Sequence, residues 1–177
     1  MAEQFERLVN DAFAQLFLAA YFGQKNKPLP PKFDEMLRVS EYNALKAEYQ
    51  DLELTPQLDL ERAFSTVPRA RFVHPRFRAF SDVNMVLPIW HTQTLGKLAQ
   101  EALEAYNGGQ PELGAEKLDS ILDNRSGYVN TSEPLLILKM LALANIKRDS
   151  SVCEVGSGSN YLVTLASQIA TNGTIIG

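Results

Sequence analysis

Residues 151–161 read SVCEVGSGSNY and decide the fold class that we expect for the chain. Their apolar start predicts a short buried strand with an acid, Glu154, at its carboxyl end, and a helix is expected from Tyr161 to Ala170. Between strand and helix, Gly156 and Gly158 let the backbone turn sharply and approach a ligand closely, because neither carries a Cβ atom. The N-terminus of the helix offers unpaired N–H groups to the same place. The stretch therefore predicts an α/β fold with a small-molecule site of the nucleotide-binding type.

Three interpretations of this glycine turn are open. A dinucleotide site has a third glycine, where this chain has Tyr161, and an acid about 20 residues further on. A strand-to-helix turn without any ligand is the second interpretation. The third rests on Glu154, which stands two residues before the first glycine. This spacing, Glu-x-Gly-x-Gly, is similar to that of S-adenosylmethionine-dependent methyltransferases, and the similarity implies a carboxylate near the cationic amino group of the ligand.

Segments before the turn resemble the protein-L-isoaspartate O-methyltransferase family, and they occur in the order that the family has them. They are Glu61-Arg62-Ala63-Phe64, Val67-Pro68-Arg69 with Phe72-Val73, Leu87-Pro88-Ile89 with Gln93-Thr94, Thr131-Ser132-Glu133-Pro134, the apolar run 135–144, and the turn itself. The resemblance covers about Leu60 to Gly177. It implies the first part of a Rossmann-like S-adenosylmethionine-dependent methyltransferase fold, truncated after the start of the second strand.

The resemblance also implies what individual residues do. The residues expected to bind the cofactor S-adenosylmethionine are Glu154, Gly156, Ser157, Gly158, Asn160 and Tyr161. Ser132 is expected to donate a hydrogen bond near the acceptor carboxylate, and capping of the next helix is a compatible structural alternative. His91 lies in the segment that the acceptor peptide approaches, so we expect it to contact substrate. The implied activity is methylation of isoaspartyl carboxylates in damaged proteins, as a step of protein repair.

The chain departs from the family pattern at several points. Asn160 replaces the third glycine, and asparagine tolerates positive φ better than most residues, so we expect the turn to persist. Trp90 and Thr92 replace two glycines. A long segment precedes Ser132, and we align Ser132 rather than Gly96 with the serine of the family because its distance to Glu154 is kept.

Proline, glycine and apolar periodicity divide the rest of the chain into helices. We expect helices at Phe5–Tyr21, 32–51, 59–64 with Asp59 as its cap, 97–106, 111–122 and 135–144, and irregular backbone at 66–93. Residues 1–57 are interpreted as a helical extension and residues 58–177 as the first part of a methyltransferase domain. The helices within 97–127 form a hairpin inserted into that domain.

The end of the chain predicts an incomplete sheet. Only one strand and the beginning of a second, Thr174–Ile176, are expected, so the chain is interpreted as the amino-terminal piece of a longer protein. Open strand edges favour self-association, which predicts a homodimer. The alternative function is a non-catalytic helical binding or assembly module that retains part of the methyltransferase fold.

Composition excludes several other classes. A net charge of −4 without basic runs argues against nucleic-acid binding, and the apolar stretches are too short or too polar for a membrane span or a signal peptide. The chain has a single cysteine, Cys153, which we expect in the buried strand. One cysteine excludes an internal disulfide framework and suits the cytoplasm. His74 and His91 have no metal-ligand spacing, so no metal is expected.

Overall fold

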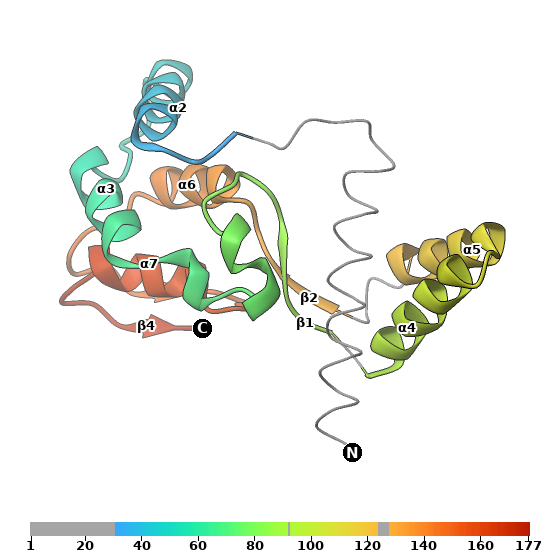
Figure 1. Cartoon of the computed structure of the whole chain (residues 1–177). Coiled ribbons are helices and arrows are strands. Elements are labelled where there is room, and N and C mark those ends of the chain that lie inside the picture. Colours follow the sequence, from blue (N-terminus) through green and yellow to red (C-terminus); the bar gives the residue numbers. More distant parts are fainter. Residues whose placement is uncertain (1–30, 92, 124–127) are drawn as a thin grey trace. The chain divides into compact units, whose positions relative to one another are not determined.

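The computed structural model describes residues 31–91, 93–123 and 128–177, which form a mixed α/β structure that is mostly helical (Figure 1). The helix expected at Phe5–Tyr21 lies outside the described residues. The chain divides into two compact units. We call Pro30–Leu87 with Asn130–Gly177 the turn unit, because it contains the glycine turn, and Pro88–Val129 the hairpin part of the other unit.

Four α-helices build the turn unit. They are α2 at Glu35–Glu48, α3 at Gln57–Thr66, α6 at Pro134–Leu143 and α7 at Tyr161–Ile169, with two short 3-10 helices, η1 at Arg69–Arg71 and η2 at Pro75–Phe80. The Asp34 carboxylate accepts a hydrogen bond of 2.9 Å from the Leu37 N–H and so begins α2. Sequence periodicity placed these helices within a few residues. The expected cap of α3 is wrong, because Pro56 precedes the helix and Asp59 lies in its first turn, where it pairs with Arg62 at 2.8 Å.

The sheet of the turn unit is small and parallel. Strand β3 at Val152–Cys153 pairs with β4 at Ile175–Ile176, and α7 connects the two strands and packs against both (Figure 1). The Val152 N–H donates to the Thr174 carbonyl at 2.8 Å, and the Glu154 N–H donates to the Ile176 carbonyl at 2.9 Å. The second hydrogen bond places Glu154 directly at the carboxyl end of β3.

The predicted burial of β3 is wrong. Cys153 is exposed, and Val155 has 95% of its surface exposed. Alternating strand residues point to opposite faces of a sheet, and α7 covers only one face of this one. Within the described residues, nothing covers the Cys153 side.

The core of the turn unit lies among its four helices. In α3 and the residue after it, Leu60, Ala63, Phe64 and Val67 recur at the three- and four-residue steps of a helix and face α6 and α7. Other members of the core are Tyr42, Leu45, Ile137, Leu138, Leu141, Ala142, Leu165, Ala166 and Ile169. This packing fixes the N-terminus of α7, where the glycine turn ends.

Thr55 is a fully buried polar residue that joins α2 to the end of α6. Its hydroxyl donates to the Leu141 carbonyl at 2.6 Å and accepts from the Ile146 N–H at 2.8 Å. The Tyr42 hydroxyl donates to the Thr55 carbonyl at 3.0 Å. Because the last carbonyls of a helix have no partner within it, Thr55 satisfies groups that burial would otherwise leave unpaired.

The other unit contains the predicted helical hairpin. Helix α4 at Gln93–Asn107 packs against α5 at Pro111–Asp123 through small buried residues that include Gly96, Ala99 and Ala102. At Gly114 a Cβ atom would lie 2.7 Å from the Tyr106 ring, so glycine allows the close approach of the two helices there.

The segment expected to be irregular contains a strand. Strand β1 at Leu87–His91 pairs with β2 at Tyr128–Thr131 in a two-stranded sheet. Pro88 had argued against a strand, but proline is tolerated in edge strands, where an N–H can be spared. No helix within the described residues is long and apolar enough to cross a membrane.

Candidate functional site

The glycine turn has the backbone that its sequence predicts. Gly156, Gly158 and Asn160 have φ angles of 76°, 52° and 61°, in the left-handed region. The Asn160 N–H donates to the Ser157 carbonyl at 2.8 Å, and the Asn160 carbonyl accepts from the Thr164 N–H at 3.0 Å. Asparagine is one of the residues that adopt this conformation at low cost, so the expected persistence of the turn is confirmed.

The backbone of the turn is open to a ligand. A Cβ atom added at Gly156 would meet no atom within 4 Å. Among the described residues, none accepts a hydrogen bond from the N–H groups of Gly156, Ser157 or Gly158. Exposed N–H groups of this kind can bind ligand oxygen atoms.

Glu154 lies at the carboxyl end of β3 and points to the start of α7. Its Oε2 atom accepts a hydrogen bond of 3.1 Å from the Val163 N–H, one of the first N–H groups of the helix. Burial raises the pKa of the Glu154 carboxyl, and the Val163 hydrogen bond partly offsets that rise. The carboxylate therefore anchors α7, and no described residue donates to its Oε1 atom, which is left for a cation.

Ser132 is held by its backbone. Arg69, only 5% exposed, donates from Nη2 to the Ser132 carbonyl at 2.8 Å and to the Met85 carbonyl at 2.7 Å. The same guanidinium reaches three more carbonyls at longer distances, those of Val83 at 3.3 Å, Ser81 at 3.4 Å and Thr131 at 3.5 Å. Arg69 thus fastens the segment before α6 to residues 81–85.

Ser132 does not cap α6, so its alternative structural role is wrong. Glu133 is the N-cap residue of α6, and its side chain makes no capping hydrogen bond. Instead, the Asn84 side chain accepts a hydrogen bond of 2.9 Å from the Leu135 N–H in the first turn. No hydrogen bond within the described residues occupies the Ser132 hydroxyl, which is half-buried.

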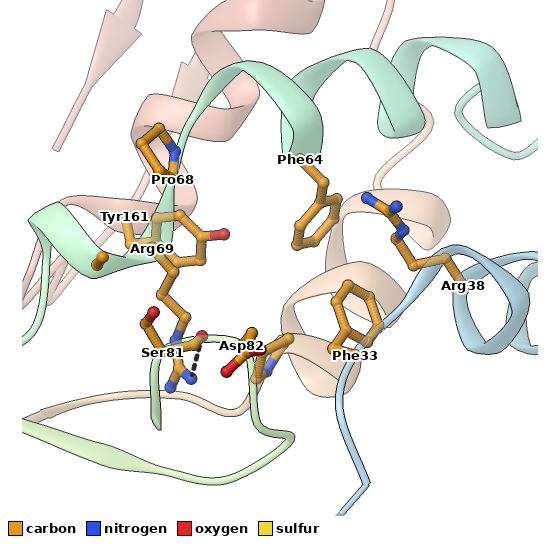
Figure 2. Close-up of a pocket in the computed structure, with 10 residues that line it drawn as sticks. Phe33, Arg38, Phe64, Pro68, Arg69, Ser81, Asp82 and Tyr161 are labelled. Carbon is orange, nitrogen blue, oxygen red and sulfur yellow. Dashed lines mark hydrogen bonds between the residues drawn. The ribbon is translucent and has the colours of Figure 1, made fainter. Parts of the chain in front are cut away.

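One pocket lies at the starts of α6 and α7. The pocket has a volume of about 220 Å³ and is lined by Pro134, Tyr161 and Arg69, among others (Figure 2). Tyr161 is 3% exposed, and its ring packs 5.1 Å from that of Phe72 and 6.5 Å from that of Phe64. Its side chain therefore belongs to an aromatic cluster, and only its backbone continues the turn.

The structure leaves the predicted role of His91 without a geometric test. His91 is the last residue of β1 in the hairpin-containing unit, and its side chain lies outside the described part. His74 packs edge-on against Phe77, with 6.1 Å between ring centroids. Among the described residues, no three His, Cys, Asp or Glu side chains are grouped so that they could hold a metal ion.

Sequence reasoning did not find the residues that position the site. Arg69 belongs to the Val-Pro-Arg segment quoted above, but its acceptors lie up to 63 residues away. Asn84 accepts a hydrogen bond from the first turn of a helix 51 residues further along the chain, and no local sequence pattern predicts this contact. No signal in the sequence singles out Arg69, because Arg71, Arg76 and Arg78 follow it within nine residues.

No known family model matches the chain, and no curated protein matches it either.

Proposed function

We propose that the chain belongs to an S-adenosylmethionine-dependent carboxyl methyltransferase with a Rossmann-like fold, similar to the protein-L-isoaspartate O-methyltransferases. The observation that carries the proposal is the path from β3 through the left-handed turn at 156–160 into α7, with Glu154 at the end of the strand. Glycine-rich turns between a parallel strand and a helix are typical nucleotide-binding positions.

The residues at the turn fit S-adenosylmethionine. Its cationic amino group matches the half-buried Glu154 carboxylate, whose Oε1 atom is not used by a described residue. Its carboxylate matches the free N–H groups of Ser157 and Gly158. When bound, S-adenosylmethionine supplies an electrophilic methyl group, so the protein needs neither a metal nor a covalent intermediate.

Within this proposal the chain acts by positioning. Ser132 orients the acceptor carboxylate with its hydroxyl, and Arg69 holds the Ser132 backbone in place. Partial burial of the site favours the reaction, because the opposite charges of donor and acceptor disappear during methyl transfer. The proposed acceptor is an isoaspartyl carboxylate in a flexible segment of a damaged protein.

Cofactor binding tests the role of Glu154. Titration calorimetry of the chain with S-adenosylhomocysteine is expected to show binding that Glu154→Gln weakens about ten-fold, since a charge-assisted contact is lost. The matched control is Glu61→Gln in α3, where the glutamine oxygen can still accept from Gln57. Equal affinity of the Glu154→Gln variant and the wild type would contradict a role of Glu154 in cofactor binding.

Methyl transfer tests the acceptor. Radiolabelled methyl groups are expected to pass to an isoaspartyl peptide and not to the same peptide with normal aspartate, and Ser132→Ala should lower the rate. Ser65→Ala is the control, because the Ser65 hydroxyl bonds only the Arg62 carbonyl of its own helix. Transfer to both peptides at the same rate would contradict isoaspartyl specificity.

A second candidate function is a non-catalytic binding module. The observation that favours it is α6, which leaves Leu136 and Met140 exposed at 45% and 49%, one helical turn apart. Binding of S-adenosylhomocysteine together with methyl transfer would exclude this candidate.

A further inference from the structure

The chain contains two Asn-Gly pairs, Asn107-Gly108 at the end of α4 and Asn172-Gly173 between α7 and β4. An asparagine before a glycine is chemically labile, because the main-chain nitrogen of the glycine can attack the side-chain carbonyl carbon, Cγ, of the asparagine. A Cβ atom on the second residue would hinder this approach, and glycine has none. Whether a pair reacts in the folded protein depends on how firmly the structure holds the attacking nitrogen.

The first pair is held by the end of α4. The Gly108 N–H donates to the Glu104 carbonyl at 2.8 Å and so continues the hydrogen bonds of the helix. Beyond it, the Gln110 N–H donates back to the Ala105 carbonyl at 2.9 Å, as is typical of a helix that ends in a glycine. The Gly108 nitrogen can reach Cγ of Asn107 only if this last turn opens and several hydrogen bonds break.

The second pair lies in an exposed turn between α7 and β4 (Figure 1). The Gly173 N–H donates to the Ala170 carbonyl at 3.3 Å, which is longer than the usual range for such bonds. Asn172 is exposed, and so are Thr171 and Thr174 on either side of the pair. One long hydrogen bond therefore restrains the attacking nitrogen, and side-chain packing does little to oppose a local opening.

The fold nevertheless requires a glycine at position 173. A Cβ atom there would collide with the Ser150 carbonyl oxygen, so the residue that makes Asn172 labile is fixed by packing. The Asn172 N–H donates to the Arg148 carbonyl at 2.7 Å. Neither contact uses the two reacting atoms, the nitrogen of Gly173 and Cγ of Asn172.

We propose that Asn172 is a site of spontaneous modification, at which the folded chain converts an asparagine into an isoaspartyl residue. The Gly173 nitrogen bonds to Cγ of Asn172, its proton leaves with the side-chain nitrogen as ammonia, and a cyclic succinimide forms. Water then opens the ring. Opening at the main-chain carbonyl leaves the chain linked through Cγ as isoaspartate, and opening at Cγ gives ordinary aspartate. The inference does not depend on the proposed methyltransferase function.

Isoaspartate at this position acts on the nearby sheet. It adds one methylene group to the main chain between residues 172 and 173 and replaces a neutral amide by a carboxylate. The Thr174 carbonyl, which comes directly afterwards, accepts the 2.8 Å hydrogen bond of the Val152 N–H. Because Gly173 has no spare room against Ser150, the longer chain must shift the start of β4. The pairing of β3 with β4 is therefore expected to loosen.

Peptide mapping of the aged full chain tests the proposal. The protein is kept at neutral pH and digested at mildly acidic pH, and mass spectrometry with electron-transfer fragmentation separates aspartate from isoaspartate. Isoaspartate is expected to form at Asn172 about ten-fold faster than at Asn107, because fewer hydrogen bonds must break. In a urea-unfolded control the two pairs should react at similar rates. Absence of isoaspartate at Asn172 in the folded chain, or an equal or faster reaction at Asn107, would overturn the proposal.

Substitution of each asparagine supplies the second arm. Asn172→Gln is expected to abolish isoaspartate formation in the fragment 149–177, because attack on the longer side chain would have to close a larger ring. Asn107→Gln is the matched control and should leave the reaction at Asn172 unchanged. Isoaspartate that persists in this fragment of the Asn172→Gln variant would refute the site.

Hydrogen exchange tests the effect on the sheet. In the isoaspartyl form, isolated by ion exchange, the N–H groups of Val152 and Glu154 should exchange faster than in the fresh protein. Asn172→Asp carries the same added charge without the extra methylene group, so its exchange should resemble that of the wild type. Equal exchange of the isoaspartyl form and the Asn172→Asp variant would contradict the expected loosening.

Discussion

Replacing Asn160 by alanine should destabilise the protein by about 1 kcal/mol, whereas replacing it by glycine should change stability by less than about 0.5 kcal/mol. Asn160 has φ 61° and ψ 14°, its side chain is exposed, and it makes no capping hydrogen bond. The effect of a substitution is therefore confined to the backbone conformation.

The magnitude follows from that conformation. A left-handed backbone costs an ordinary L-residue roughly 1–2 kcal/mol, and asparagine avoids part of this cost. Alanine would bear the full cost. Glycine has no such cost, but its unfolded chain is more flexible, which offsets the gain.

Urea unfolding followed by circular dichroism measures the difference. A loss of 1 kcal/mol should lower the midpoint by about 0.5 M at the slopes usual for domains of this size. Asn172→Ala is the matched control, because Asn172 is exposed and has no positive φ. The reasoning fails if Asn160→Ala and Asn172→Ala have the same midpoint, or if glycine at position 160 destabilises as much as alanine.

Three further predictions concern buried polar contacts. Thr55→Val should lower the free energy of unfolding by about 2–5 kcal/mol, because the Leu141 carbonyl of α6 and the Ile146 N–H both lose their partner. Thr55→Ser keeps the hydroxyl and should lower it by only about 1 kcal/mol. Equal urea midpoints of the two variants would contradict this. Asn84→Ala should cost about 1 kcal/mol through the lost cap of α6, and hydrogen exchange in the first turn of α6 should rise relative to α2; an unchanged ratio would argue against the cap. The pKa of Glu154 is raised in the folded state, so its contribution to stability is complete below the ordinary value of 4.5 and is lost as the pH rises through the folded pKa. The wild type should therefore lose stability relative to Glu154→Gln as the pH rises over that range. A gain in the wild-type unfolding midpoint relative to the variant would contradict the raised pKa.

Local features of the chain could be predicted from the sequence. The start of α7 at Tyr161 and of α5 at Pro111 follow from glycine, proline and apolar spacing, which act within a few residues. The left-handed backbone of Asn160 was predictable for the same reason, because it depends on the residue itself.

Features that depend on distant partners could not be predicted. Strand β1 forms because β2 lies beside it, and the partner begins near residue 128, far along the chain. The exposure of Cys153 depends on which face of the sheet α7 covers. The role of Arg69 depends on carbonyls in two other segments, so the residue that supports the Ser132 backbone emerged only from the structure.

The most direct test of the central claim is a titration of the isotope-labelled chain with S-adenosylhomocysteine, followed through its backbone amide signals. We predict saturable shifts centred on Glu154, Gly156 and Gly158, with α2 unaffected. Absence of saturable shifts at the turn, or the same shifts with a nicotinamide dinucleotide in its place, would contradict the assignment of this turn to S-adenosylmethionine.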